Sequence, residues 1–484
     1  MTVSALVQAA LALTAALFGY AVGHALGGVV GGGLVALVAA LVAAWGVTRP
    51  GWQLDLSRCP RPFLVLSAVA TVGALAQLFR LTLFMVDPTA VGFSMVPGSQ
   101  WEQRHSCATA YFVAAGAATS PSGPYAHEHY SDLTADPTKP RVPLRLGQFN
   151  VDVYEYPPQF LLLPQVLRSM APEYPQFRLL WFGLCGLFLL AATGIVARFL
   201  GPSVGTVALL LSPLLWVALP TFSHLQKGNV QGVVIAAAML AMVAFERGRP
   251  AAGGALLAFA TVSKLYPGLL VVYLLAERRY RDVVWTIAAG ILISLITLLD
   301  LGWGAYVHFL EHLPQLLGGE AFPALRMPAA MANNFSIPGL VFKAKLFGVP
   351  GMDFTAAKIV GWLYTAVILA LTLLAAKKSW RPEQKPVVWL GILILATLRS
   401  PFLPQAYAAL PVLWLLTLLA ALDTAHLRRL PWLLLAFAGL NVYWPNDWVF
   451  DPRWRSLVLA IPQVLSVVLA VIALRPRTQT AGTA

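Results

Sequence analysis

Apolar runs of about twenty residues follow one another along most of the chain, separated by short polar loops. A helix of about that length is enough to cross the hydrocarbon core of a bilayer. The runs lie near 4–22, 28–47, 63–86, 179–199, 203–222, 230–245, 283–300, 356–376, 386–400, 405–422, 430–444 and 456–474. This pattern predicts an all-α polytopic membrane protein with a bundle of about twelve transmembrane helices.

The positive charges predict how these helices are oriented. Lys and Arg gather in alternate short loops, for example at Arg247 and Arg249, and cytoplasmic loops carry such an excess. Both termini are therefore expected in the cytoplasm. Two long loops, 87–177 and 301–336, are expected on the outer side.

The segment 251–276 does not fit a simple crossing. As one span it would place Arg278 and Arg281 outside, and Lys264 and Pro267 interrupt its apolar run. Two half-length helices, 251–262 and 266–276, keep both flanks inside. The sequence therefore predicts a re-entrant hairpin that enters from the cytoplasm and is buried in the bundle, because non-helical backbone at membrane depth needs protein or water around it.

Composition narrows the class of protein further. Hydrophobic residues make up 58% of the chain and charged residues 11%, which excludes a soluble globular protein of this length. The net charge of +13 lies in the short loops, so it favours topology over a nucleic-acid partner. Three cysteines give no disulfide framework. Usage rich in Ala, Leu, Val and Arg suggests a bacterium, so we expect a multi-pass protein of the plasma membrane.

The two outer loops carry most of the acidic and polar side chains, so an active site would open to the periplasm or the exterior. The first loop ends in Glu155-Tyr156-Pro157-Pro158, just before an apolar run. Pro157 pushes Tyr156 into an extended shape, and aromatic rings suit the membrane interface. This cluster can hold Asp152 and Glu155 at the boundary between water and lipid.

Several separate segments resemble a known family in its order. They are the Glu155-Tyr156-Pro157-Pro158 cluster, Lys227-Gly228-Asn229, Arg247-Gly248-Arg249-Pro250 followed by Ser263-Lys264-Leu265-Tyr266-Pro267, Asn333-Asn334-Phe335-Ser336, and Ser400-Pro401. Together they resemble the GT-C superfamily of membrane glycosyltransferases, and most closely glycosyltransferase family 87, which includes bacterial polyprenyl-phosphate-mannose-dependent mannosyltransferases.

The resemblance implies a division into three parts. Residues 1–62 would form an N-terminal transmembrane hairpin and cytoplasmic loop, residues 63–423 a GT-C-like catalytic core with the outer loop 87–177, and residues 424–484 a C-terminal hairpin and tail. It also implies the reaction: a sugar, expected to be mannose, passes from a polyprenyl-phosphate donor to a lipid or glycan acceptor on the outer face.

Such a reaction needs a carboxylate that takes the acceptor proton. The family usually has an Asp in the first outer loop, near the start of a surface helix, but the comparable segment from Trp101 to Tyr111 has only Glu102. Glu102 is therefore the expected base, and Asp87, Asp152 and Glu155 remain alternatives.

Cationic and polar groups must hold the leaving phosphate and the sugars. The expected donor- and acceptor-binding residues are Tyr156, Lys227, Asn229, Lys264, Arg326, Asn334, Ser336 and Arg399. Arg399 is expected on the phosphate through its planar guanidinium. Lys264 is the deepest cation, and intramembrane charges often mark functional sites.

Two further questions stay open at the level of the sequence. His127, Glu128, His129 and Asp132 could bind a divalent metal, but a polar loop explains them better, so no metal ligand is assigned and a divalent metal is left open. A transporter or flippase for a lipid-linked or polar solute is the alternative function, and a non-catalytic membrane scaffold is a third.

Overall fold

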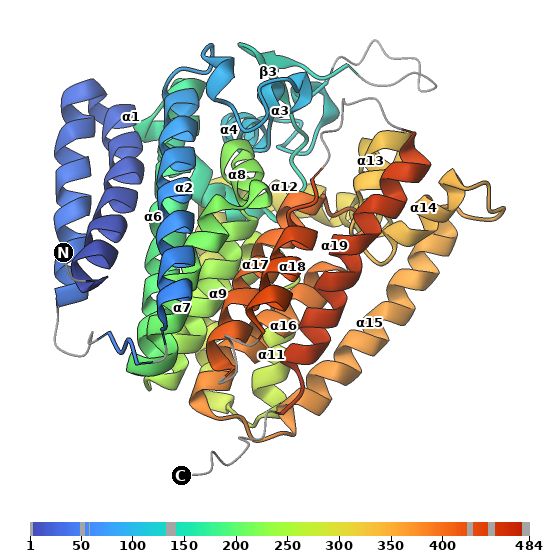
Figure 1. Ribbon diagram of the computed structural model, residues 1–484. Helices are drawn as coiled ribbons and strands as arrows, with labels where there is room; N and C mark the ends of the chain where they lie inside the picture. Colours follow the sequence, from blue (N-terminus) through green and yellow to red (C-terminus); the bar gives the residue numbers. More distant parts are fainter. Residues whose placement is uncertain are drawn as a thin grey trace.

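The computed structural model describes residues 3–48, 54–57, 59–131, 142–423, 429–443 and 451–476. It is a bundle of long helices, with a small domain of short elements at one end (Figure 1). We call this end the loop end, because residues 87–131 and 142–173 lie there. The end near the C-terminus is called the opposite end.

The chain begins with a helical hairpin. Helix α1 (Val3–Thr48) turns back on itself at Gly27 and Gly28, whose φ angle is +63°. The two arms touch so closely that a Cβ on Gly23 would clash with the backbone oxygen of Gly31. The expected N-terminal pair of helices is therefore present, and it packs on α2 (Arg61–Val86) and α6 (Tyr174–Phe199).

The loop end is built from short elements. They are η1 (Val91–Phe93), α3 (Gln100–Arg104), β1 (His105–Ser106), α4 (Ala108–Ala117), η2 (His127–His129), β2 (Arg145–Leu146), β3 (Phe149–Val151), η3 (Pro158–Leu161) and α5 (Leu162–Met170). The three strands form one sheet in the order β1-β3-β2, in which β1 and β3 are parallel and β2 is antiparallel to β3. Segments about 45 residues apart in the chain are thus joined side by side.

The centre of the bundle consists mostly of apolar helices, several of which are largely buried. Its helices are α7 (Gly201–Val217), α8 (Leu219–Lys227), α9 (Gln231–Glu246), α10 (Pro250–Ser263), α11 (Gly268–Ala276), α16 (Lys385–Thr397) and α17 (Gln405–Leu422). Every described residue of α16 from Pro386 to Thr397 is buried. Helices α7 and α8 are bent by 66° relative to each other.

The remaining helices cover the outside. They are α12 (Tyr280–Gly318), η4 (Pro323–Arg326), α13 (Pro328–Asn333), α14 (Gly339–Leu346), α15 (Phe354–Ala376), η5 (Pro382–Gln384), α18 (Leu430–Leu440) and α19 (Pro452–Ala473). Helix α12 is broken at Gly302, whose φ and ψ of 72° and 176° are not helical. Its second half leaves the bundle axis and runs across the loop end (Figure 1).

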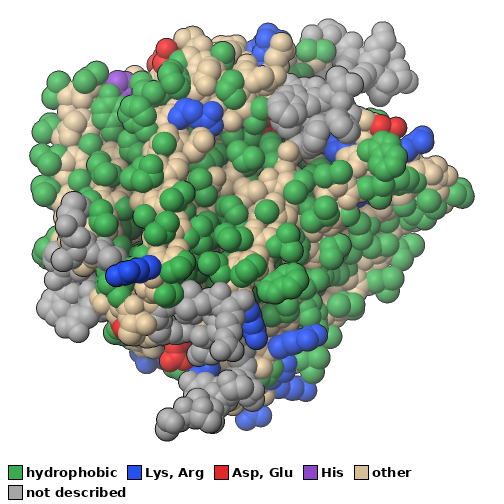
Figure 2. All heavy atoms as spheres, in the orientation of Figure 1, with side chains coloured by type: hydrophobic (Ala, Val, Ile, Leu, Met, Phe, Trp, Pro, Cys, Tyr) green, Lys and Arg blue, Asp and Glu red, His purple; other side chains and the backbone are tan. Residues whose placement is uncertain are grey.

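The fold is that of an all-α membrane protein. Among the described residues, 7 helices are long and apolar enough to cross a bilayer, or up to 8 if α7 and α8 form one broken span. The count of about twelve crossings is thus not confirmed, partly because α1 is one continuous element with two arms and because α9, α10 and α18 are short. Apolar side chains cover the helical flank, and Lys and Arg gather at the opposite end (Figure 2).

The predicted hairpin is present in α10 and α11. Arg279, which follows α11, forms an ion pair with Glu246 at the end of α9, and Lys385 at the start of α16 pairs with the same carboxylate at 2.7 Å. Both ends of the α10–α11 segment therefore lie together at the opposite end of the bundle. Its turn, with Lys264, points toward the loop end.

Candidate functional site

Polar side chains from distant parts of the chain meet where the small domain rests on the bundle. We call them the polar cluster: Glu102, His105, Cys107, Asp152, Glu155, Tyr156, Lys227, Asn229, Lys264, Tyr407 and Tyr443. They come from α3, β1, the segment after β3, the end of α8, the tip of the hairpin, α17 and the segment after α18.

The small sheet places the two loop segments of the cluster next to each other. His105 is paired with Asn150, and Ser106 with Val151. The Thr109 hydroxyl accepts a hydrogen bond from the Asp152 amide at 2.9 Å and donates to the Ser106 carbonyl. The Asp152 backbone is therefore fixed beside His105.

The end of α8 brings Lys227 and Asn229 to this sheet. The helix stops at Gly228, whose φ of +70° suits glycine. The Trp181 indole donates to the Gly228 carbonyl at 2.8 Å, and the Ser106 hydroxyl donates to the Lys227 carbonyl at 3.2 Å. The turn between α8 and α9 is thus held from both sides.

Glu102 is already paired inside the cluster. It is 1% exposed, and its Oε1 accepts hydrogen bonds from the Lys227 ammonium at 2.9 Å and from the Tyr443 hydroxyl at 2.6 Å. The Gln226 amide donates to its backbone carbonyl at 2.6 Å. These contacts join α3, α8 and the segment after α18.

Asp152 and Glu155 are the partly exposed carboxylates of the cluster. Burial against protein raises the pKa of Asp152 to about 6, although hydrogen bonding and Lys227 oppose the change. Burial also raises the pKa of Glu155 well above its usual value, and the neighbouring Asp152 adds to this while Lys264 opposes it. Glu155 therefore interacts both with Asp152 and with the cation at the hairpin tip.

Lys264 faces the Glu-Tyr-Pro-Pro segment. Its ammonium lies 5.4 Å from the centre of the Tyr156 ring, a cation–π contact. The Tyr156 hydroxyl accepts hydrogen bonds from the Tyr111 hydroxyl at 3.1 Å and from the Asn229 amide at 3.4 Å. Within the described part of the chain Lys264 has no ion pair.

His105, Cys107 and Asp152 form the tightest group. One donor atom from each lies within 4.8 Å of the other two. Burial lowers the pKa of His105 to about 3, with Lys227 adding to the effect, and raises the pKa of Cys107 to about 12. The Tyr407 hydroxyl lies 3.0 Å from the Cys107 sulfur, and the Asn229 amide donates to that sulfur at 3.4 Å.

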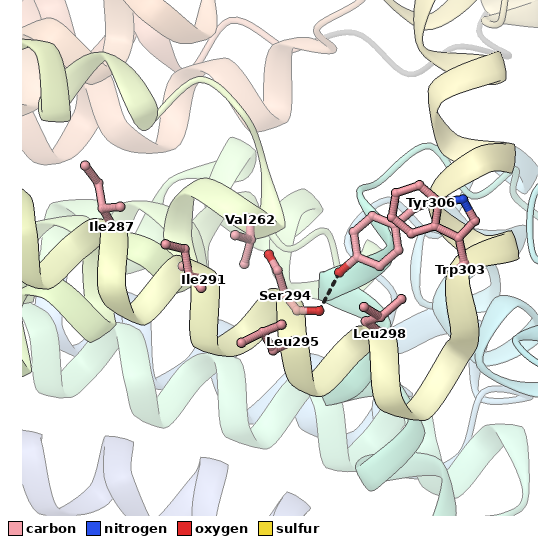
Figure 3. Close-up of a pocket in the computed structure, with 9 residues that line it drawn as sticks. Val262, Ile287, Ile291, Ser294, Leu295, Leu298, Trp303 and Tyr306 are labelled. Atoms are coloured by element: carbon pink, nitrogen blue, oxygen red, sulfur yellow. Dashed lines mark hydrogen bonds between the residues drawn. The ribbon is translucent and has the colours of Figure 1, made fainter.

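An open groove of about 420 Å³ lies next to this region, on the outside of α10 and α12 (Figure 3). It is lined by Val262, Ile287, Gly290, Ile291, Ser294, Leu295, Leu298, Trp303 and Tyr306. The Tyr306 hydroxyl donates to the Ser294 carbonyl at 2.7 Å across the break in α12. Gln159, one residue after the Tyr-Pro-Pro run, donates to the Ser294 hydroxyl at 3.1 Å.

The structure places the other expected site residues elsewhere. Asp87 is exposed and accepts hydrogen bonds from Thr89, which lower its pKa. Arg326 donates to the Glu320 carbonyl at 3.3 Å, away from the cluster. Arg399 lies on the α15 side of α16, where its Nε donates to the Thr365 hydroxyl at 2.7 Å and its guanidinium lies over Trp362.

Asn334 and Ser336 hold two loop segments together. Both side chains donate to the Pro401 carbonyl, at 2.9 and 3.0 Å, and the Asn334 oxygen accepts from the Leu403 amide. Both are fully buried. The Asn333–Ser336 segment and the segment that begins with Ser400-Pro401 are therefore hydrogen-bonded to each other.

The metal group considered in the sequence is not the one that the described residues bring together. His129 contacts Ser120 and Ser122 through its Nε2, and Asp132 lies outside the described residues. Sequence reasoning missed His105, Cys107, Tyr407 and Tyr443. His105 and Cys107 had a signal, since they stand in the helix region where an Asp was sought, whereas Tyr407 and Tyr443 had none.

The chain was also compared with known proteins. A family model described as Glycosyltransferase family 87 matches residues 154–403. That range includes Glu155, Tyr156, Lys227, Asn229 and Lys264, while Glu102, His105, Asp152 and Tyr443 lie outside it. No curated protein and no solved structure matches the chain.

Proposed function

The chain belongs to glycosyltransferase family 87 and is thus a membrane-bound transferase, and we propose that it moves mannose from a polyprenyl-phosphate carrier to a hydroxyl of a lipid or glycan acceptor. The Lys264 hairpin was the reason for considering a transporter. The family model includes this hairpin, and the family is one of glycosyltransferases. We propose further that the loop end faces the outside of a bacterial plasma membrane.

One observation carries the choice of a lipid-linked donor: Gln159 joins the apolar groove to the Glu-Tyr-Pro-Pro segment, and the same segment faces Lys264, a cation with no ion pair among the described residues. Val262 lines the groove, and Lys264 follows two residues later at the hairpin tip. An isoprenoid chain suits the groove, since its walls are apolar and open to the bilayer side of α12. The phosphate at the head of that chain would then lie against Lys264.

The same arrangement supports a base. Glu155 interacts electrostatically with Lys264 and with the neighbouring Asp152, whereas Glu102 is paired with Lys227 and Asp87 is hydrogen-bonded to Thr89. Asp152 is held by the Thr109 hydroxyl through its backbone and keeps its side chain partly exposed. We therefore assign the base role to Asp152, with Glu155 next to it as a hydrogen-bonding group.

The step balances with these groups. The acceptor oxygen bonds to the anomeric carbon of the sugar while the bond from that carbon to the phosphate oxygen breaks. The acceptor proton passes to the Asp152 carboxylate. The polyprenyl phosphate leaves with one more negative charge, which the Lys264 ammonium stabilises. No nucleotide takes part in the step.

The test is transfer of radiolabelled mannose from a polyprenyl-phosphate donor by the purified protein in detergent, with glucose and galactose donors alongside. Lys264→Met is expected to raise the donor KM by roughly ten- to a hundredfold, because a charge-assisted hydrogen bond contributes about 1.5–3 kcal/mol.

Lys343→Met is the matched control. Lys343 is also a buried lysine, but it donates to Gln463 between α14 and α19. It should leave the donor KM unchanged. Transfer that is equal in the wild type and Lys264→Met would exclude Lys264 from the donor site, and no transfer from any lipid-linked sugar would exclude the proposed reaction.

A further inference from the structure

We propose that His105, Cys107 and Asp152 form a binding site for a zinc ion, and that zinc bound there stops sugar transfer by occupying the base. The metal-binding part stands on geometry alone. The inhibitory part rests on the proposed function, since it requires Asp152 to take the acceptor proton.

Two of the three distances between the donor atoms are close to those of a tetrahedral site. The His105 Nε2 lies 3.9 Å from the Asp152 Oδ2 and 3.8 Å from the Cys107 sulfur. Zinc bonds of about 2.0–2.3 Å to nitrogen, oxygen and sulfur place tetrahedral ligands about 3.5 Å apart. A contraction of a few tenths of an ångström would bring these two distances to those of a bound ion, and the Cys107 sulfur and the Asp152 oxygen, which lie within 4.8 Å of each other, would approach as well.

The donor set suits zinc over harder cations. Imidazole nitrogen and thiolate sulfur are the ligands that zinc prefers, and calcium and magnesium prefer oxygen. Three protein ligands leave a fourth position for water, the pattern of an open site. Asp152 is 38% exposed and His105 16%, so an ion can reach the group from solvent.

The groups around the ligands fit a bound metal. Asn229 donates to the Cys107 sulfur, and the Tyr407 hydroxyl lies within hydrogen-bond distance of it, so both can stabilise a thiolate. The Trp101 ring stacks on His105 with centroids 4.7 Å apart. The pairing of β1 with β3 fixes the two ligand-bearing segments in register.

A nearby cation does not prevent metal binding. Lys227 acts on both His105 and Asp152, but its charge is compensated by Glu102 at 2.9 Å. The thiolate and the carboxylate bring two negative charges to the site once the thiol proton has left. The site with one zinc ion is therefore close to neutral.

The decisive experiment uses cobalt as a visible substitute for zinc. The purified full-length protein in detergent is titrated with Co²⁺, and absorption is recorded in the near ultraviolet, where a cobalt–thiolate bond absorbs, and in the visible range, where tetrahedral cobalt does. Wild type is expected to develop both bands with about one ion per chain, and Zn²⁺ is expected to remove them.

Cysteine variants identify the ligand. Cys107→Ser is expected to lose the near-ultraviolet band, while Cys59→Ser and Cys185→Ser keep it, because those two thiols are also buried but stand apart from the group. His105→Gln keeps every cysteine and should weaken binding about tenfold or more, since even outer-shell changes cost about 10–100-fold. If Cys107→Ser fails to fold, metal binding by His105→Gln tests the site in its place.

Inhibition of sugar transfer by Zn²⁺ is measured in a separate experiment. Zn²⁺ is expected to inhibit mannose transfer in the wild type, and His105→Gln should need about tenfold more Zn²⁺ for half inhibition relative to its own metal-free rate. Absence of cobalt bands in the wild type, or bands that survive in both Cys107→Ser and His105→Gln, would overturn the site. Cobalt bands without inhibition by Zn²⁺ would support the metal site but overturn its proposed effect on sugar transfer.

Discussion

At the scale of single residues, the four carboxylates considered as the base differ in the contacts that they already make. Asp87 accepts hydrogen bonds from Thr89, and Glu102 is paired with Lys227. A paired, buried carboxylate has little freedom to take a proton from a substrate. Among the described residues, neither Asp152 nor Glu155 has an ion pair with a lysine or arginine, and Glu155 interacts electrostatically with Lys264.

Asp152→Asn is therefore expected to fold, to bind the donor and to lose about 10²–10⁴-fold in kcat, the usual cost of removing one positioned base. Turnover with saturating donor is the measurement, and Asp87→Asn, which changes a carboxylate away from the cluster, is the matched control. If Asp152→Asn keeps more than about a tenth of wild-type turnover, Glu155 becomes the better assignment.

Glu102→Gln is expected to act through stability. The change leaves the Lys227 ammonium buried without a counter-charge, and breaking a buried pair in this way costs about 3–5 kcal/mol. The fraction of protein that stays monodisperse after heating should fall at a lower temperature than in the wild type. A Glu102→Gln variant of unchanged heat stability that has lost turnover would instead restore Glu102 as the base.

The sequence predicted several of these residues but not their partners. Tyr156, Lys227, Asn229 and Lys264 do meet in one cluster, because each belongs to a motif at an element end. The sequence could not show that Lys227 forms an ion pair with Glu102, since 125 residues separate them. Arg399 had the chemistry for phosphate, but it faces α15 because Thr365 and Trp362 take its guanidinium.

At the scale of elements, the broken helix α12 shapes the groove. Gly302 has a φ of 72° and a ψ of 176°, a combination that is essentially open only to glycine. The break lets Trp303 and Tyr306 fold back over Ser294. Apolar periodicity predicted a span that ends near residue 300, but it could not predict that the helix would resume in a new direction.

Gly302→Ala is expected to destabilise the protein by about 1–3 kcal/mol, the cost of a strained backbone conformation, and to weaken binding of a polyprenyl-phosphate donor. Gly290→Ala is the matched control: Gly290 lines the same groove in regular helix, and no atom lies within 4 Å of an added Cβ. Donor binding by fluorescence or calorimetry separates the two. Equal donor affinities in the two variants would show that the break does not shape the lipid site.

At the scale of the whole molecule, charge patterning predicted the arrangement better than apolar length did. The rule that keeps basic residues on one side required the hairpin, and Arg279 indeed lies with Glu246 and Lys385. Length alone predicted about twelve crossings, yet α9, a helix of 16 residues, lies almost entirely in the buried interior. Such a helix is covered by protein, so the thickness of the bilayer does not set its length.

The sidedness itself can be measured by cysteine labelling. Tyr280→Cys, at an exposed position after the hairpin, should react with an impermeant maleimide only in inside-out vesicles. Glu128→Cys, exposed at the loop end, should react only in intact cells. The native cysteines are all buried and serve as background. Labelling of both positions from the same side would contradict the predicted hairpin topology.

The hairpin has a consequence for the proposed donor site. Its two helices are anchored at the opposite end by Glu246, which binds Arg279 and Lys385 at once, and its tip carries Lys264, which we propose holds the donor phosphate. Loss of the Glu246 anchor is therefore expected to loosen both ends of the hairpin and, through its tip, to weaken the proposed contact between Lys264 and a phosphate at the far end of the bundle.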